Sequence, residues 1–157
     1  MVNLSLNKNT DSVIRLKAGT VIFSEGQNSK YLYIVKAGQV RLLNIAGHRL
    51  SVMSICKEKD VLNEVSVLSN KPTEFAAVAK TDVELVLVEQ KDILAVVNSG
   101  PSWISNIFKT LCERLIATNE IIVEHNLKSG NQDPETILSN EEELFHSNAL
   151  REYKTKK

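Results

Sequence analysis

The sequence is short of cysteine, of net charge and of long apolar runs, and each shortage excludes a class of protein. The only two cysteines, Cys56 and Cys112, stand far apart without a CxxC spacing, so neither a disulfide framework nor a zinc or iron–sulfur site is indicated. Nineteen lysine and arginine residues balance nineteen aspartate and glutamate residues, which leaves no global positive field to attract nucleic acid. A strongly charged partner is therefore not implied.

A membrane location is disfavoured as well. No apolar run approaches the roughly 20 residues that a bilayer-spanning helix needs. The opening residues, MVNLSLNKNTDS, lack the basic and apolar regions of a signal peptide. We therefore expect a cytoplasmic protein with no membrane partner.

The composition that remains is that of an ordinary globular domain. Of the 157 residues, 43% are apolar and 24% are charged. A chain of this length buries roughly two thirds of its unfolded surface when it folds, which is enough for one domain with a proper core.

Residues 13–89 read as a series of short strands. Runs of β-branched residues are broken at regular intervals by Gly, Asn, Asp and Lys, and the run at 31–35 is apolar on both of its faces. Two apolar faces favour a closed roll or a sandwich over a sheet with one solvent-exposed face. The candidate strands are residues 21–23, 31–35, 40–45, 50–56, 75–79 and 83–88.

Helical spacing is found inside and after the strands. Residues 60–69 predict a short helix within the β region, and residues 91–98 predict another after it. A long helix is then expected from residue 102 to about residue 127, with apolar residues every three or four positions. Such a helix would be about 39 Å long, more than one small roll can cover.

The far half of this helix therefore needs a partner, and we expect a homodimer. The alternative, that the apolar stripe packs only on its own domain, stays open at this stage. The side chains expected at the dimer interface are Phe108, Leu111, Leu115 and Ile122.

A last helix is expected after Asp133 and Pro134, which form a good N-cap and first-turn pair. Its stripe, which could dock, consists of Ile137, Leu138, Leu144 and Phe145, and the final EYKTKK is expected to be solvated and frayed. This tail could also contact a protein partner.

The predicted fold is mainly β with α. It is a double-stranded β-helix (a jelly roll or β-roll) followed by a long C-terminal dimerisation helix. The expected divisions are an N-terminal segment at 1–11, the roll at 12–100, the long helix at 101–129 and a tail with a short helix at 130–157.

This order of features resembles the cyclic-nucleotide-binding domains of catabolite-activator and FNR-type regulators. The segment LKAGTVIFSEGQNSKYLYIVKAGQVRLL is similar to the opening strands of that family. Gly19, Gly26 and Gly38 match its glycine positions, and Tyr33 and Ile34 match its aromatic and aliphatic positions. The resemblance implies a β-roll that holds a small ligand.

The stretch VLNEVSVLSNKPTEFAAVA stands in the place of that family's phosphate-binding cassette, whose pattern is Phe-Gly-Glu, aliphatic residues, a short loop, and then Arg before a strand. The resemblance implies that Glu64 accepts a hydrogen bond from the ribose 2′-hydroxyl. In the family, helix-start amides and the arginine hold the phosphate. Here Asn63 replaces the glycine, and the arginine position falls on Thr73 or Glu74 according to loop length.

Counting back from the strand residues Ala76 and Val78 favours Glu74 as the residue at the arginine position. Thr118 and Asn119 fall where the family makes polar contacts to the base. The implied pocket, degenerate at its phosphate end, contains Leu62, Asn63, Glu64, Val65, Ser66, Thr73, Glu74, Phe75, Thr118 and Asn119. Binding of cyclic AMP or cyclic GMP is expected to be impaired or absent.

The segment after the long helix also differs from that of the regulators, in which a DNA-binding helix-turn-helix follows. Only about 30 residues follow Leu127, they contain EEE, and they cannot supply two helices of a basic helix-turn-helix. We expect no DNA binding by this chain.

The leading hypothesis is a non-enzymatic, homodimeric sensor or adaptor with no certain cofactor, although a cyclic nucleotide or another small ligand is possible. The alternative is a structural or protein-interaction dimer without a ligand. A metal-dependent enzyme of the cupin type is less favoured, because His48, His125 and His146 show no ligand spacing. A haem sensor is less favoured too: His48, in an expected hairpin loop, could ligate haem, but a lone histidine is more often a surface residue.

Overall fold

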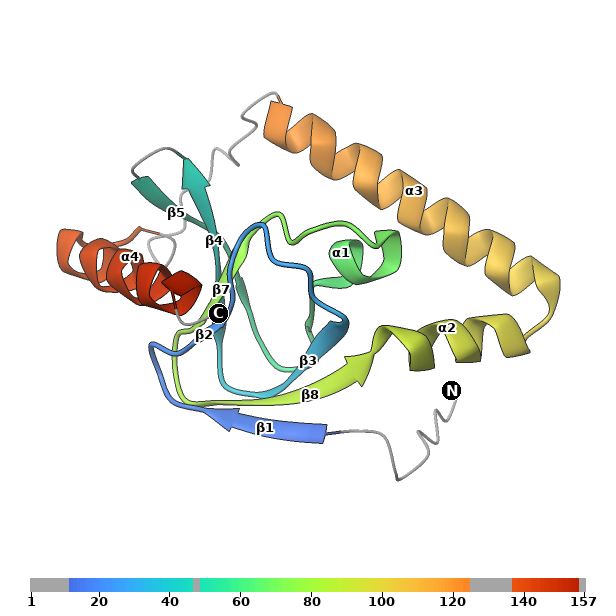
Figure 1. Ribbon diagram of the computed structural model, residues 1–157, viewed down its shortest axis with the longest axis horizontal. Helices are drawn as coiled ribbons and strands as arrows, with labels where there is room; N and C mark the ends of the chain where they lie inside the picture. Colours follow the sequence, from blue (N-terminus) through green and yellow to red (C-terminus); the bar gives the residue numbers. More distant parts are fainter. Residues whose placement is uncertain (1–11, 47–48, 125–136, 156–157) are drawn as a thin grey trace.

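The computed structural model describes residues 12–46, 49–124 and 137–155, and two antiparallel sheets form the body of the molecule (Figure 1). The first sheet has the order β1-β8-β3-β6, with β1 Ser12–Leu16, β3 Tyr31–Ala37, β6 Val61–Leu62 and β8 Val83–Glu89. The second has the order β2-β7-β4-β5, with β2 Val21–Phe23, β4 Val40–Ala46, β5 Arg49–Cys56 and β7 Ala76–Ala79. The expected β-roll with added helices is confirmed.

The core lies between the two sheets. Its buried members include Phe23 and Tyr33, whose rings stack at 5.6 Å, and the fully buried Leu62 and Leu85. Strand β7 contributes to two cores, since alternate side chains of a strand point to opposite faces. Ala77 and Ala79 enter the inner core, whereas Ala76 and Val78 enter a second cluster on the outer face.

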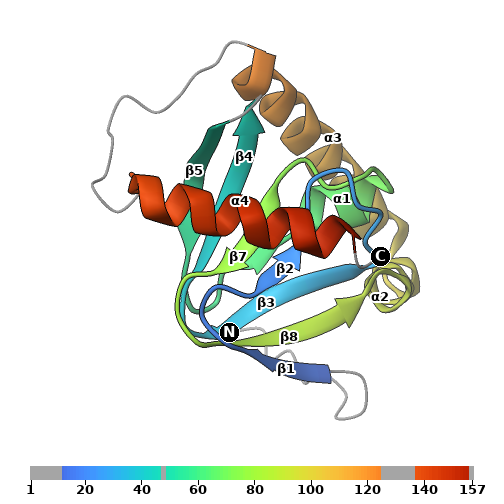
Figure 2. The same cartoon turned by 60° about the vertical axis from the view of Figure 1, so that its left-hand side comes forward.

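Four helices complete the described part of the chain: α1 Glu64–Ser69, α2 Gln90–Ser99, α3 Ser102–Glu124 and α4 Asn140–Thr155. Helices α2 and α3 follow the last strand, and α3 packs against both α1 and α2. Helix α4 crosses the outer face of the second sheet, over β2, β7 and β4 (Figure 2). Among the described helices, none is both long and apolar enough to cross a membrane.

The strand and turn predictions hold with small shifts at the ends. The glycines expected in turns, Gly19, Gly26 and Gly38, all have positive φ angles, of 84°, 78° and 86°. Strand β1 was not among the candidate strands, and it pairs along its length with β8.

The single helix predicted over residues 60–69 is wrong in its first half. Leu62 pairs with Tyr33 as part of β6, and the helix begins only at Glu64. Asn63, with φ of 68°, lies in the left-handed region and separates the two elements. Pairing with a distant strand thus overrides the local helical spacing.

The predicted docking stripe of the last helix is also wrong in part. Ile137, Leu144 and Phe145 are more than half exposed, whereas Leu150 and His146 are buried. The C-terminal end is not frayed as far as Thr155, because α4 continues to that residue and the Tyr153 hydroxyl donates to the Ile22 carbonyl at 3.3 Å. The expected long helix is described from Ser102 to Glu124, and the expected start of the tail helix at 133–134 lies outside the described residues.

Candidate functional site

The candidate site is the cassette that runs from β6 through α1 to β7. Leu62 is fully buried and anchors its beginning in the inner core. Asn63 follows in the left-handed conformation, where glycine is easiest but asparagine is also tolerated. Its side-chain amide donates to the Tyr31 carbonyl at 2.9 Å, and its own carbonyl accepts from Val67 at 3.1 Å. Asn63 therefore adopts the left-handed conformation that glycine favours.

Glu64 begins α1 and is half-buried. Burial raises the pKa of its carboxyl above the usual range, and a hydrogen bond with its own backbone amide lowers it in part. Desolvation of the charged form is the larger effect. Glu64 lies in the first turn of α1, and its bond to a ligand hydroxyl stays a prediction.

The next residues of α1 hold the loop that follows. Ser66 is buried, its hydroxyl donates to the Pro72 carbonyl at 3.3 Å, and its carbonyl accepts from Lys71 at 3.1 Å. Val65 is half-buried, and its carbonyl accepts from the Ser69 hydroxyl at 2.5 Å. These predicted site residues shape the loop rather than present free polar groups.

Thr73 fastens the same loop to the turn between β2 and β3. Its side chain is 3% exposed, and its hydroxyl donates to the Ser24 carbonyl at 2.6 Å while it accepts from the Gln27 amide at 3.0 Å. The Thr73 carbonyl accepts from Gly26 at 2.8 Å, and its amide donates to the Gln27 carbonyl at 3.0 Å. All of its polar groups are used within the protein.

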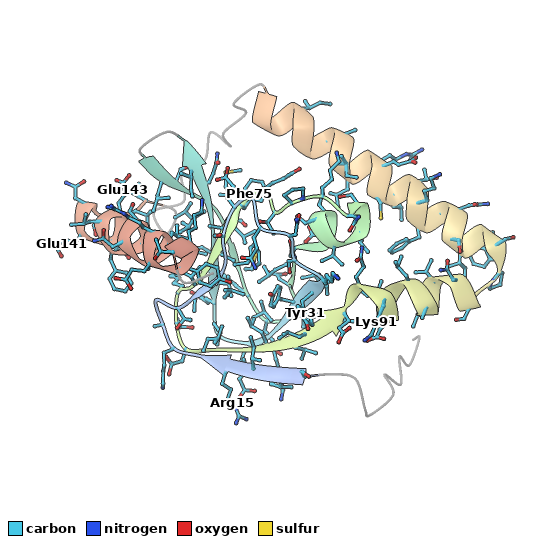
Figure 3. All side chains as sticks on the ribbon, viewed as in Figure 1. Arg15, Tyr31, Phe75, Lys91, Glu141 and Glu143 are labelled. Carbon is cyan, nitrogen blue, oxygen red and sulfur yellow. The ribbon has the colours of Figure 1, made fainter. Side chains whose placement is uncertain are left out.

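Glu74 and Phe75 are half-buried where the cassette loop enters β7. Phe75 is labelled in Figure 3. The Oε2 atom of Glu74 is buried, and it has no hydrogen-bond partner among the described residues. The same is true of Oε2 of Glu25, whose neighbours Ser24 and Gly26 bind Thr73. Residues 72–79 contain no lysine or arginine. Residues 72–79 therefore add a carboxylate and no cation to this end of the site.

Glu25 was not predicted as a site residue. Glu25 lies near the cassette loop because Gly26 pairs with Thr73, two residues 47 positions apart in the chain. Nothing in the spacing of its own segment carries that signal.

Of the two base-contact residues predicted on α3, the structure describes the side chain of Thr118 alone. Thr118 is exposed, and its hydroxyl donates to the Arg114 carbonyl one turn earlier at 2.8 Å. The side chain of Asn119 lies outside the described part of the chain. Hydroxyl bonds of this kind are common within helices and carry no ligand signal by themselves.

The expected interface residues of α3 differ in how exposed they are. Phe108 is half-buried on its own domain, whereas Leu111 and Leu115 are exposed, and the Ile122 side chain is not described. The exposed apolar side chains form a stripe along one side of α3: Trp103, Ile107, Leu111, Leu115 and Ile121. We call this set the α3 stripe.

A metal centre has no support in the described residues, because no three His, Cys, Asp or Glu side chains gather there at ligand distance. His48 and His125 lie outside the described residues. His146 is a buried residue of α4, and its Nε2 atom is 3.1 Å from Nη1 of Arg41.

The fold and the cassette together define a β-roll effector domain. A family model described as the cyclic nucleotide-binding domain matches residues 13–99, more than half of the chain. The chain belongs to the cyclic nucleotide-binding domain family.

Two curated relatives are regulators by name. The chain is 30% identical over 98 residues to the "Cyclic AMP receptor protein" of Thermus thermophilus, covering 62% of this chain and 45% of the relative. It is 26% identical over 102 residues to the "CRP-like cAMP-activated global transcriptional regulator" of Mycobacterium tuberculosis, covering 64% and 46%. The chain thus spans about half the length of these relatives.

Solved structures agree on the fold. The Thermus thermophilus Catabolite Activator Protein is similar with a TM-score of 0.61 at 23% identity, over 73% of this chain and 54% of that one. The EAL enzyme Bd1971 in its cGMP-bound form is similar with a TM-score of 0.62 at 20% identity, over 72% of this chain and 30% of that one. At such identities the likeness concerns the fold alone.

Proposed function

We propose that this chain is a non-enzymatic sensor or adaptor domain, homodimeric through α3, in which binding of cyclic AMP and cyclic GMP is impaired or lost. The functional unit is the roll at 12–100 with the long helix at 101–129. The observation that carries the proposal is the absence of a basic residue from 72–79, where Thr73 and Glu74 are the candidates for the phosphate-binding position.

Neither candidate replaces a guanidinium. Thr73 is buried and uses its hydroxyl on Ser24 and Gln27, and Glu74 brings a negative charge. Loss of one partner of a buried charge pair costs on the order of 2–5 kcal/mol, or roughly two to four decades in affinity. Binding of a cyclic phosphate should therefore be weak.

The remainder of the cassette supports a ligand of different charge. Asn63 keeps the left-handed turn, and Glu64 still offers a carboxylate for a hydroxyl. Glu25 and Glu74 each add a buried carboxylate oxygen without a partner among the described residues. A ligand with hydroxyl groups and without a buried phosphate, or one that carries a positive group, suits this arrangement best.

A structural dimer whose roll binds nothing is the second candidate. The observation that favours it is the half-burial of Phe75 and the complete use of Thr73 within the protein. Both features suit a pocket closed by the chain itself.

Calorimetric titration with cyclic AMP and cyclic GMP tests the proposal. We expect no micromolar binding to the native chain and a gain of tenfold or more in Glu74→Arg, because the substitution turns a repulsive charge into a bidentate donor; the tenfold gain corresponds to about 1.4 kcal/mol. Glu74→Gln is the matched control, since it removes the negative charge without adding a donor.

The same titration with Thr73→Arg tests the other candidate position, with Thr73→Val as its control for the lost hydrogen bonds. Micromolar or tighter binding to the native chain would overturn the proposed impairment. No gain in either arginine variant, with both variants folded, would favour the closed pocket of a structural dimer.

A further inference from the structure

A buried polar cluster joins α4 to the outer face of the second sheet. Arg41 of β4 donates through Nη2 to Oε1 of Glu142 at 2.8 Å, and its Nη1 lies 3.1 Å from Nε2 of His146. His146 is 4% exposed, and the Arg41 side chain is 12% exposed. We call these three residues the α4 cluster.

The geometry of the α4 cluster requires a neutral imidazole. A guanidinium has donors and no acceptor, so Nε2 of His146 must accept the bond from Arg41. A proton added at Nε2 would occupy the position of that bond. It would also place a second cation 3.1 Å from the first in a site with little solvent. The docked arrangement and a charged His146 are therefore incompatible.

The surroundings of His146 offer little to stabilise its cation. The Phe145 ring lies edge-on at 5.5 Å, and Nδ1 is buried without a partner among the described residues. Burial first, and the Arg41 charge second, lower the pKa of His146 below its ordinary value of 6.5, against a smaller opposing effect of Glu142.

The other charged groups around His146 come from both packed elements. Glu142 accepts from the Ser139 amide and from Arg41, and these bonds lower the pKa of its carboxyl below 4.5. Glu141 and Lys80 line a cavity of about 510 Å³ beside the cluster, with Arg41 and His146. Since the Glu142 carboxylate stays ionised, protonation of the cluster above pH 4.5 falls on His146.

Other contacts also attach α4 to the sheet. Glu143 accepts from the Leu50 amide at 3.0 Å, Tyr153 donates to the Ile22 carbonyl at 3.3 Å, and Leu150 is the buried apolar side chain of the helix. Beneath α4 lie the fully buried Leu43 and Val78 of the outer cluster. Loss of the α4 cluster would remove both contacts of Arg41 with the helix, those to Glu142 and to His146.

We propose that Arg41, His146 and Glu142 form a proton-operated latch, which holds α4 on the sheet while His146 is neutral and releases it when His146 gains a proton. The proposal concerns the outer face of the sheet and does not rest on ligand binding in the roll. Release of α4 uncovers an apolar sheet face, and acid is the signal.

The direction of the pH effect follows from proton linkage. Docked α4 binds fewer protons at His146 than released α4, so docking is complete above the ordinary pKa of about 6.5 and weakens as the pH falls below it. Between pH 6.5 and pH 5.5 the docking equilibrium should change by up to about tenfold, because one proton is coupled to it.

Amide hydrogen exchange of the full chain tests the latch. Peptides from residues 140–155 are compared with peptides from β8 at pH 7.5 and pH 5.5, after correction for the intrinsic pH dependence of exchange. We expect α4 to lose up to about tenfold in protection relative to β8 at the lower pH.

His146→Gln is the decisive variant. Its side-chain oxygen can accept the bond from Arg41 but cannot gain a proton, so α4 should keep equal protection at both pH values. His146→Lys carries a charge at both pH values and should leave α4 unprotected at both. If His146→Lys does not fold, the comparison of the native chain with His146→Gln still decides. Equal pH responses in these two proteins, or no response in the native chain, would overturn the proposal.

Discussion

Helices α3 and α4 differ in how their composition relates to their burial. Helix α3 is the more apolar, yet Trp103 and Leu111 remain 60% and 59% exposed. Helix α4 starts with three glutamates in its first turn, yet it buries His146 and Leu150 on the second sheet. The apolar content of a helix therefore does not predict how much of it is buried. Burial depends on the surface against which the helix packs.

The difference lies in what each helix meets. Helix α4 meets a sheet face with a buried cation, Arg41, and with apolar side chains that leave a place for Leu150. Helix α3 meets the short helices α1 and α2, which cover one of its sides. The α3 stripe is left exposed among the described residues, and we propose that a second copy of the chain covers it.

The largest expected effect is the loss of the dimer when the α3 stripe is charged. The double variant Leu111→Glu, Leu115→Glu should raise the Kd for dimer dissociation by about a thousandfold or more, because an unpaired buried carboxylate costs several kcal/mol. Sedimentation equilibrium measures the Kd. Lys109→Glu, at a position whose side chain is 77% exposed, is the control and should leave the Kd within about threefold. A native chain that is monomeric at tens of micromolar would contradict the proposed dimer through α3.

A smaller effect should follow from a cavity under α4. Leu150→Ala removes a buried side chain and should lower the free energy of unfolding by about 2–4 kcal/mol. Leu144→Ala, on the same helix but 63% exposed, should change it by no more than about 0.5 kcal/mol. Urea unfolding provides both values. Similar losses in the two variants would mean that α4 does not dock on the face described above.

The smallest effect separates backbone strain from the contact with α4. Gly19 and Gly26 share positive φ angles, of 84° and 78°, so alanine at either position should cost roughly 1–2 kcal/mol. A Cβ atom at Gly19 would also come within 2.9 Å of the Phe145 ring, whereas nothing lies within 4 Å at Gly26.

Gly19→Ala should therefore be the more destabilising of the two by up to about 1 kcal/mol, because Phe145 must shift. Thermal unfolding of both variants, alone and combined with Phe145→Ala, measures this difference. The excess should disappear when Phe145 is absent. If Gly19→Ala remained the more destabilising in the Phe145→Ala background, the additional loss of stability would come from the loop and not from the contact with α4.

Much of the fold could be predicted from local signals. The β-branched runs gave strands β2, β3, β4, β5, β7 and β8 to within a few residues, and the apolar spacing after Pro101 gave α3. Strand β6 could not be predicted, since Leu62 is a strand residue only through its pairing with Tyr33. Local spacing there is equally suited to the helix that begins two residues later.

The candidate site divides in the same manner. The cassette segment and the missing basic residue are visible in the chain, but Thr73 as the fastening of the loop depends on Ser24 and Gln27, almost fifty residues away. That Thr73 or Glu74 occupies the phosphate-binding position stays a prediction. So does the contact of Thr118 and Asn119 with the base of a ligand.

The sequence by itself determined strands β2, β3, β4, β5, β7 and β8, the glycine turns and the lack of a cation in residues 72–79, because each depends on neighbouring residues. Only the tertiary structure decided which face α4 uses. Its helical period offers Leu144 and Phe145 as readily as His146 and Leu150, and the choice depends on Arg41 of β4, more than a hundred residues away. Burial of a polar pair is favourable only where both partners arrive together, which no local pattern can specify.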